Sequence, residues 1–327
     1  MRKFPTKISL GNDSTRATQI VLGYYHTCTI DSTDAFKCWG KNASGQLGDS
    51  TTTNRNTPTT ISLGSDSSSA TMIALGYEHS CAIDSLNNLK CWGENDKGQI
   101  GDGSNTQRNE PKIISLGLGS VYATEMALGY HHSCIIDSER RVSCWGSNDY
   151  GQLGDGTTDD VSTPKRITLG PNTSSAKEIA AGAYFSCVID RLDKLYCWGR
   201  NNKGQLGDGT TTQRKTPVLI SLGTGNVSPT AIALGGSHTC AINNLDQLLC
   251  WGWNGYGQLG DGTRTDRVIP TLISLGSGSI FATNVALGRY HTCALDNSET
   301  LLCWGHNNRG QVGDGTKNDI LTPKLIL

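Results

Sequence analysis

Cysteines are the residues of this sequence most able to do chemistry, and they are regularly arranged. In residues 26–49, HTCTIDSTDAFKCWGKNASGQLGD, Cys28 and Cys38 lie ten positions apart around a polar turn, and Trp-Gly follows the second cysteine. Two such cysteines can form a disulfide, act as a redox centre or bind a metal ion. The rest of the chain narrows this choice, because it repeats the passage five more times.

The repeat has a fixed length. The triplet Cys-Trp-Gly recurs every 53 residues, with its cysteine at Cys38, Cys91, Cys144, Cys197, Cys250 and Cys303. The upstream cysteines keep the same step, so all 12 cysteines belong to the repeat and no insertion interrupts it. An internal period of this size is typical of solenoids and propellers.

Each repeat predicts several short strands. The segment IALG is apolar and bounded by glycine, and the runs HTCAID and LxCWG are joined by a polar link that indicates a hairpin. The stretch GQLGDGTT is typical of a loop. Four-stranded units of 40–50 residues are typical of a β-propeller. Since neither end looks like the polar cap of a solenoid, we expect an all-β propeller.

The ends of the chain suggest how the propeller closes. Residues 4–10 and 321–327 both match the Thr-Pro-x-x-Ile-Ser-Leu phase, so this strand occurs seven times and the others six times. We expect a single domain over residues 1–327 with six blades, seven being the alternative, closed by one terminal strand. The other copy would be redundant, and an unpaired edge strand can pair with another chain.

The string WGxNxxGQLGDGT, preceded by GxxHTCAID and LxCWG, resembles the regulator-of-chromosome-condensation repeat over essentially the whole chain. The resemblance implies a β-propeller, commonly of seven blades. Its functions range from guanine-nucleotide exchange to chromatin docking and, in a bacterial propeller, inhibition of β-lactamases, so it implies no single function. The paired cysteines suggest a bacterial or extracellular member rather than a nuclear one.

The position of the cysteines in the hairpin favours disulfides. If the turn centres on Thr33, Cys28 and Cys38 lie opposite each other, at a separation that a disulfide can bridge. Free cysteines packed beside the tryptophan, or a metal site, are the alternatives, although zinc sites usually use close Cys-x-x-Cys spacing. The expected pairs are Cys28–Cys38, Cys81–Cys91, Cys134–Cys144, Cys187–Cys197, Cys240–Cys250 and Cys293–Cys303.

Disulfides would place the protein in an oxidising compartment, either extracellular, periplasmic or on a cell surface. The net charge of −1 gives no global attraction for nucleic acid, and no apolar run of 18 residues predicts membrane insertion. The N-terminal residues also lack the apolar region of a signal peptide.

Most of the remaining chemistry-bearing residues recur in phase, which indicates structural roles. Five histidines share one phase, but Phe185 takes their position in the fourth repeat, so packing explains them better than a metal ring. Six aspartates occupy Gly-Asp turns without the ligand pattern of a calcium loop. No catalytic motif is present. We therefore expect no enzyme activity, no cofactor and no metal site.

The positions where the repeat varies are the best candidates for binding. The loop before each HTCAID strand and the loop after each Trp-Gly should lie at the same end of a blade. Tyrosine, tryptophan and arginine, which dominate interface hot spots, gather there. The candidate residues are Tyr24, Tyr25, Tyr77, Glu78, Tyr130, His131, Tyr184, Arg200, Trp253, Arg289, Tyr290 and His306.

Two functions fit this pattern. In the first, a secreted or surface propeller binds a protein or glycan through its tyrosine-rich loops. In the second, copies of the chain assemble through the redundant terminal strand into a fibre or a larger surface protein. A simpler interpretation of the tyrosines is that they only shield the centre of the propeller.

Overall fold

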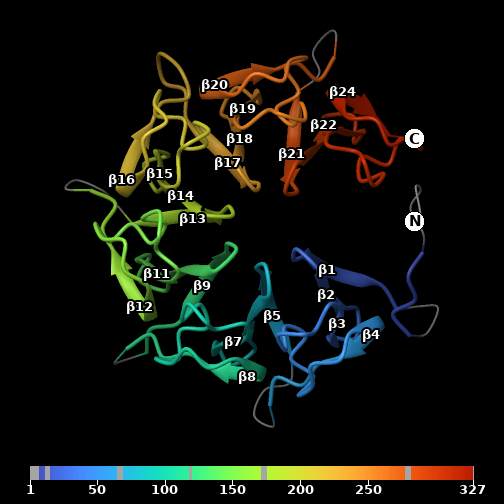
Figure 1. The fold of residues 1–327 in the computed structure, drawn as a ribbon, viewed down its shortest axis with the longest axis vertical. Coiled ribbons are helices and arrows are strands. Elements are labelled where there is room, and N and C mark those ends of the chain that lie inside the picture. Colours follow the sequence, from blue (N-terminus) through green and yellow to red (C-terminus); the bar gives the residue numbers. More distant parts are fainter. Residues whose placement is uncertain are drawn as a thin grey trace. The chain divides into compact units, whose positions relative to one another are not determined.

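The computed structural model describes residues 7–11, 15–64, 69–117, 120–170, 175–276 and 281–326. Within these ranges the protein is all β, with six antiparallel sheets of four strands each (Figure 1). Every sheet consists of strands that are consecutive in the sequence. Each 53-residue repeat therefore corresponds to one blade, which confirms the six-bladed propeller fold. No described helix is long and apolar enough to cross a membrane.

The first compact half of the chain, Ile8–Thr168, contains three blades. Blade 1 consists of β1 (Ala17–Leu22), β2 (His26–Asp31), β3 (Phe36–Gly40) and β4 (Arg55–Thr60). Blade 2 consists of β5 (Ala70–Leu75), β6 (His79–Asp84), β7 (Leu89–Gly93) and β8 (Arg108–Ile113). Blade 3 consists of β9 (Ala123–Leu128), β10 (His132–Asp137), β11 (Val142–Gly146) and β12 (Val161–Ile167).

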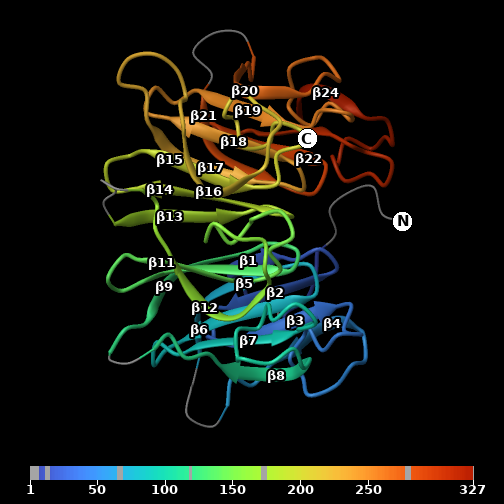
Figure 2. The ribbon, with the colours of Figure 1, turned by 60° about the vertical axis from the view of Figure 1, so that its left-hand side comes forward.

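The second compact half contains Leu169–Leu327 and three further blades. Blade 4 consists of β13 (Ala176–Ala181), β14 (Phe185–Asp190), β15 (Leu195–Gly199) and β16 (Arg214–Ile220). Blade 5 consists of β17 (Pro229–Leu234), β18 (His238–Asn243), β19 (Leu248–Gly252) and β20 (Arg267–Ile273). Blade 6 consists of β21 (Ala282–Leu287), β22 (His291–Asp296), β23 (Leu301–Gly305) and β24 (Ile320–Leu325). The blades of each half can be followed by colour in Figures 1 and 2.

The two terminal copies of the last strand differ in their roles. The C-terminal copy provides β24, which pairs with β23 and completes blade 6 from within the same repeat. It is therefore not redundant, and within the described ranges its strand partner is β23. Residues 7–10 of the N-terminal copy form no strand, and residues 4–6 lie outside the described residues.

The central hairpin of each blade has the predicted register. In blade 1, Cys28 pairs with Cys38 and Ile30 pairs with Phe36. The carboxylate of Asp31 fixes the turn, because its Oδ1 accepts hydrogen bonds from the backbone N–H groups of Thr33 and Ala35. This side-chain turn is the kind that aspartate favours between two strands.

All six predicted disulfides are present, and each links residues directly opposite in the central hairpin. The Cα atoms of each pair lie 4.1 Å apart, as expected for a close cross-strand pair. No described cysteine is free. The two alternatives for the cysteines, free thiols and a metal site, are therefore wrong.

The hydrophobic core lies between neighbouring blades. One cluster joins Cys28, Cys38 and Leu47 of blade 1 to Ile73 and Trp92 of blade 2. The tryptophan of the Cys-Trp-Gly triplet is fully buried in blades 2 to 6 and half-buried in blade 1. Trp92, Trp145, Trp251 and Trp304 each pack in a cluster with residues of the preceding blade, so these repeats do not bury their apolar surface alone.

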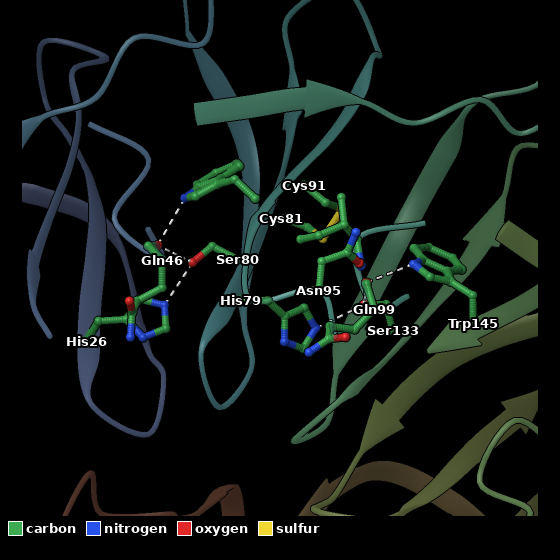
Figure 3. Close-up of a disulfide and its surroundings, with 12 residues drawn as sticks. His26, Gln46, His79, Ser80, Cys81, Cys91, Asn95, Gln99, Ser133 and Trp145 are labelled. Carbon is green, nitrogen blue, oxygen red and sulfur yellow. Dashed lines mark hydrogen bonds between the residues drawn. A yellow bond between two sulfur atoms is a disulfide. The ribbon is translucent and has the colours of Figure 1, made fainter. Parts of the chain in front are cut away.

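A buried hydrogen-bond network, here called the interblade clasp, joins the same neighbours (Figure 3). The backbone carbonyl of Gln46 accepts hydrogen bonds from Ser80 Oγ at 2.7 Å and from Trp92 Nε1 at 3.0 Å. Ser80 Oγ also lies 2.8 Å from His26 Nε2. Since the serine donates its only proton to Gln46, His26 must donate from Nε2 and is the Nε2–H tautomer.

The clasp recurs where blade 2 meets blade 3 and where blade 5 meets blade 6. Gln99 accepts from Ser133 and Trp145, and Gln258 accepts from Thr292 and Trp304. His79 and His238 lie 3.0 Å from the respective hydroxyl oxygens. The histidine phase is therefore structural, as the sequence predicted.

Phe185 shows which part of the clasp can be replaced. Where blade 4 meets blade 5, the carbonyl of Gln205 still accepts hydrogen bonds from Thr239 and Trp251. The phenyl ring of Phe185 is fully buried, and the Cβ position of Gly182 lies close to it, just as that of Gly235 lies close to the His238 ring. A ring of this size is thus required there, whereas its hydrogen bond is not.

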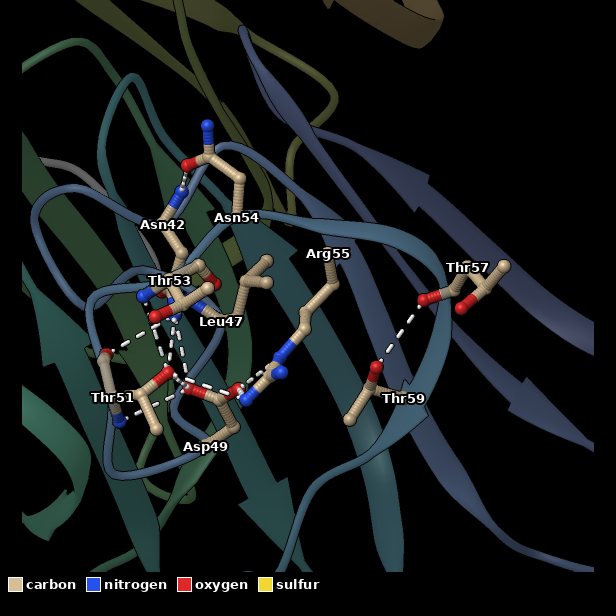
Figure 4. Close-up of polar contacts among 9 residues, drawn as sticks. All are labelled: Asn42, Leu47, Asp49, Thr51, Thr53, Asn54, Arg55, Thr57 and Thr59. Carbon is tan, nitrogen blue, oxygen red and sulfur yellow. Dashed lines mark hydrogen bonds and ion pairs between the residues drawn. The ribbon is translucent and has the colours of Figure 1, made fainter.

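The loop after each Trp-Gly is held by a second network (Figure 4). Asn42 Nδ2 donates to Asp49 Oδ1 at 2.9 Å, and its Oδ1 accepts from the Leu47 backbone N–H. Arg55 Nε donates to Asp49 Oδ2 at 2.7 Å. Partial burial raises the pKa of Asp49, but hydrogen bonds from Thr51, Arg55 and Asn42 outweigh it, and the net pKa lies below the ordinary value. These residues are structural, as predicted.

The cation of this network changes position in two repeats. Repeats 3 and 6 have no arginine equivalent to Arg55. Instead, Lys165 donates to Asp155 and Lys324 donates to Asp314, each from four positions further along the chain. A cation therefore reaches the loop aspartate in these repeats also.

A glycine at the clasp provides a test of this packing. Gly101 has φ +88°, and an added Cβ would lie 2.5 Å from Trp145 Nε1, whereas Gly225 has φ +89° and nothing within 4 Å. We expect Gly225→Ala to lower the free energy of unfolding by about 1–2 kcal/mol, through backbone strain alone. Gly101→Ala should cost about 1–3 kcal/mol more, because it also overpacks the clasp. Denaturant unfolding measures both, and equal losses would contradict the contact with Trp145.

The buried histidines predict acid sensitivity. Burial lowers the pKa of His132 and His238 from 6.5 to about 3. Burial, opposed by the charge of Glu78, lowers the pKa of His26 to about 4. Between these values and pH 6.5 the unfolded chain binds more protons than the folded one. The free energy of unfolding should therefore be constant above about pH 7 and fall as the pH drops below 6.5.

His238→Phe isolates one of these groups. Its free energy of unfolding should decline less steeply than that of the wild type between pH 6.5 and 4.5, by up to about 1.4 kcal/mol per pH unit. Most carboxylates remain ionised in this window. Denaturant unfolding at several pH values measures the slope, and the same slope in both proteins would show that His238 is not kept neutral.

Candidate functional site

The two variable loops of each blade lie side by side, as predicted. The backbone N–H of Lys41, which follows Trp-Gly, donates to the carbonyl of Tyr25 in the loop before β2. The same hydrogen bond recurs in the other five blades. Its donor and acceptor are Glu94 and Glu78, Ser147 and His131, Arg200 and Tyr184, Trp253 and Ser237, and His306 and Tyr290. The candidate residues therefore gather at one end of each blade.

In the first half of the chain, five rings form the N-terminal tyrosine cluster, which consists of Tyr24, Tyr25, Tyr77, Tyr130 and His131. The ring centroids of Tyr24 and Tyr77 are 4.7 Å apart, and those of Tyr77 and Tyr130 are 4.9 Å apart. These three tyrosines occupy equivalent positions in successive repeats. A hydrogen bond with Tyr77 and partial desolvation raise the pKa of Tyr25, which is 46% exposed.

A buried carboxylate lies beside this cluster. Glu78 is buried and forms an ion pair with Lys41 of the preceding blade, and it also accepts a hydrogen bond from Ser44 Oγ at 2.6 Å. Burial raises the pKa of Glu78, but these two partners outweigh it and the net pKa is lowered. The Lys41 ammonium lies 5.1 Å from the Tyr25 ring centroid. Glu78 therefore holds the Lys41 ammonium beside the Tyr25 ring.

In the second half, Trp253, Tyr256, Tyr290 and His306 form the C-terminal aromatic cluster. Trp253 contacts Tyr290 at 5.0 Å between centroids, and Tyr256 stacks on His306 at 4.0 Å. The exposed Arg289 guanidinium lies 4.6 Å from the Tyr290 ring. Partial burial lowers the pKa of His306, against the opposing charge of Asp319.

The remaining two candidates pair with each other. Arg200 lies 5.7 Å from the centroid of the Tyr184 ring in blade 4. This is the arrangement of a cation–π contact at a surface that is partly exposed.

Sequence reasoning missed Tyr256 and Ser44, and it left Lys41 out of the candidates although Lys41 occupies the same variable position as Arg200 and Trp253. Tyr256 and Ser44 occupy one position of the repeat, three residues after the residue that follows Trp-Gly. This position varies as strongly as the others, with Ser44, Lys97, Tyr150, Lys203, Tyr256 and Arg309. That variation was the available signal.

The side chains of the two aromatic clusters are suited to binding a ligand through packing contacts. Tyrosine and tryptophan offer rigid apolar area with a polar edge, and the neighbouring lysine and arginines add positive charge. The aspartates and asparagines of the repeat are used in the loop network, whereas one repeated glutamine reaches a cluster, since Gln311 Nε2 lies 3.2 Å from His306 Nδ1.

The comparisons with known proteins agree with the fold. The family described as regulator of chromosome condensation (RCC1) repeat matches residues 38–83, 91–136, 141–189, 193–242 and 246–295. The ultraviolet-B receptor UVR8 of Arabidopsis thaliana is 32% identical over 308 residues, which cover 94% of this chain and 69% of the receptor. A protein RCC2 homolog of Danio rerio is 31% identical over 70% of this chain, which spans about half of that relative, 51%.

Two solved structures share the fold. Human WBSCR16 has a TM-score of 0.88 and 22% identity, covering 100% of this chain and 84% of that one. Prp20p from Saccharomyces cerevisiae has a TM-score of 0.80 and 22% identity, covering 94% of this chain and 76% of that one. The chain therefore belongs to the regulator of chromosome condensation (RCC1) repeat family and has a β-propeller fold with six blades.

Proposed function

We propose that this protein is a non-catalytic binding propeller that captures a protein through the aromatic side chains of its loops, with a glycan as the alternative ligand. The observation that carries the proposal is the convergence of variable loop positions into the two aromatic clusters. The repeated positions build the blades, and the positions that vary between repeats form the aromatic clusters.

The chemistry of the clusters supports a protein ligand. Tyrosine, tryptophan and arginine contribute most of the binding energy at protein interfaces, because they bury large areas at a low entropic cost. The solved yeast relative of this fold has also been described bound to Kap60. For the present chain, the net charge of −1 supports a partner other than nucleic acid.

The edges of the blades favour this function over assembly by strand exchange. Strand order places the fourth strand at one edge of each sheet. Each of these strands contains a proline, namely Pro58, Pro111, Pro164, Pro217, Pro270 or Pro323. Proline lacks the N–H that a further strand needs, so it discourages edge-to-edge pairing.

Binding should depend on the clusters. We expect Tyr77→Ala with Tyr130→Ala, or Trp253→Ala alone, to weaken capture of the ligand about tenfold or more, because interface anchors of this type dominate affinity. The immobilised protein would be tested against cell-surface and secreted proteins and against a glycan array. Tyr122→Ala is the control, since Tyr122 is exposed next to the opposite end of β9 from Tyr130.

The outcome decides between ligand classes. Retained proteins that both cluster variants lose identify a protein ligand, and retained glycans identify the alternative. Equal capture by the wild type and by the cluster variants, with folding confirmed by circular dichroism, would exclude the aromatic clusters as the binding surface.

We further propose that the protein acts outside the cytosol, in the periplasm or at the cell surface. Six disulfides support this location, because reducing compartments disfavour such bonds. If protein isolated from its own cells is alkylated without reduction after acid quenching, we expect no labelled cysteine by mass spectrometry. Labelling of all 12 cysteines would contradict the proposed location.

A further inference from the structure

Three side chains with metal-binding atoms meet where blade 2 contacts blade 3. Glu94 and Asp96 lie in the loop after β7, and His131 lies in the loop before β10. One oxygen of each carboxylate and one imidazole nitrogen all lie within 4.8 Å of one another. The ligands come from two repeats, so only the folded chain brings them together.

The imidazole and one carboxylate are close to the spacing of two ligands on a single ion. His131 Nδ1 lies 3.0 Å from Glu94 Oε2. Two ligands that are each about 2.1 Å from a tetrahedral ion are about 3.4 Å apart, so a shift of about 0.4 Å would place both on one ion. Asp96 is exposed at the rim, so its carboxylate can complete the set by rotation of its side chain.

A neighbouring amide holds both carboxylates. Gln99 Nε2 donates to Glu94 Oε2 at 3.2 Å and to Asp96 Oδ1 at 3.3 Å. Gln99 is itself buried, and its Oε1 accepts from the Lys97 backbone N–H. Buried groups of this kind orient metal ligands in known sites.

The cation of the same loop is paired elsewhere. Lys97 Nζ lies 3.4 Å from Asp160 Oδ2. The ammonium of Lys97 is thus directed to Asp160, and the partner of Glu94 is the imidazole of His131.

The junction between blades 1 and 2 has different residues at the three equivalent positions. Lys41, Ala43 and Glu78 are the equivalents of Glu94, Asp96 and His131. There the Lys41 ammonium supplies the positive charge for Glu78. At the second junction the lysine is replaced by a carboxylate, a second carboxylate is added and the partner is an imidazole.

We propose that Glu94, Asp96 and His131 bind a divalent transition-metal ion such as Zn²⁺ or Co²⁺, with water at the remaining positions. One imidazole and two carboxylates are typical ligands for these ions, whereas Mg²⁺ and Ca²⁺ prefer oxygen alone. The sequence analysis predicted no metal site, because His131 is out of phase with the repeated histidines and its partners are 35 and 37 residues away.

The site lies at the edge of the N-terminal tyrosine cluster, since the Tyr77 and His131 rings are 5.5 Å apart between centroids. Metal binding does not depend on the proposed ligand-binding function and can be measured without any ligand.

Titration calorimetry of tag-free, chelator-treated protein with ZnCl₂ tests the proposal, and CoCl₂ adds a visible absorption band that reports the ligands. We expect one equivalent to bind. His131→Ala and Asp96→Asn should each weaken binding about tenfold or more, because each removes a direct ligand. Asp149→Asn is the matched control, since Asp149 occupies the position of Asp96 in the next repeat and should change affinity by less than about threefold.

Three outcomes would overturn the proposal. The first is the absence of saturable binding by the folded wild type. The second is equal weakening by Asp96→Asn and Asp149→Asn, which would indicate only a diffuse acidic surface. The third is tighter binding of CaCl₂ than of ZnCl₂, which would exclude the imidazole as a ligand. Near-ultraviolet circular dichroism establishes that each variant is folded.

Discussion

The backbone carbonyl of one glutamine, shared by a hydroxyl and an indole N–H from the next blade, is the interaction on which the rest of each half depends. At Gln46 this oxygen accepts from Ser80 and Trp92, and His26 donates to the same serine. All of these groups are buried, so losing one partner would leave another unsatisfied, at a cost of about 1–3 kcal/mol. Because donors and acceptor come from two repeats, neither repeat satisfies its polar groups or its apolar surface alone. The clasp thus links each of these repeats to the next at the same positions, as from Gln46 to Trp92.

The clasp also explains why so many residues that could do chemistry are used structurally. Histidine is kept neutral beside the serine hydroxyl, and the cysteines staple the hairpin that carries both the histidine and the tryptophan. Asn42, Asp49 and Arg55 hold the loop that presents Gln46 to the next blade. Phe185 marks the limit of this requirement, because a phenyl ring preserves the packing while Thr239 still reaches Gln205.

The sequence was sufficient wherever a contact repeats in phase. The pairing of Cys28 with Cys38, the hairpin turn and the structural histidines could all be predicted, since six copies of one pattern reveal which positions the fold requires. The sequence was insufficient where one repeat makes the same contact from another position. For example, Lys165 pairs with the loop aspartate in place of the arginine found in other repeats. The sequence also could not show which side chains meet across blades. Glu94 and His131 are 37 residues apart, and nothing in the alternation of either strand indicates that their loops are neighbours. Tyr256 was missed because the sequence does not show that its ring stacks on His306 of the next repeat, although its position varies between repeats.

Residues 37 positions apart meet across neighbouring blades, and the fold tolerates different residue types at these two positions. At three junctions the residue after Trp-Gly contacts its partner in the next blade, as Lys41 with Glu78, Glu94 with His131 and Trp253 with Tyr290. These pairs are respectively an ion pair, a potential metal site and an aromatic contact, yet the clasp beneath each pair uses the same atoms. Substitution at such a pair leaves the clasp hydrogen bonds themselves intact, although loss of the buried Glu78 would deprive Lys41 and Ser44 of their acceptor. A framework of disulfide-bonded hairpins joined by clasps can thus carry unlike binding groups on successive blades, because the clasp residues and these variable pairs occupy different positions of the repeat.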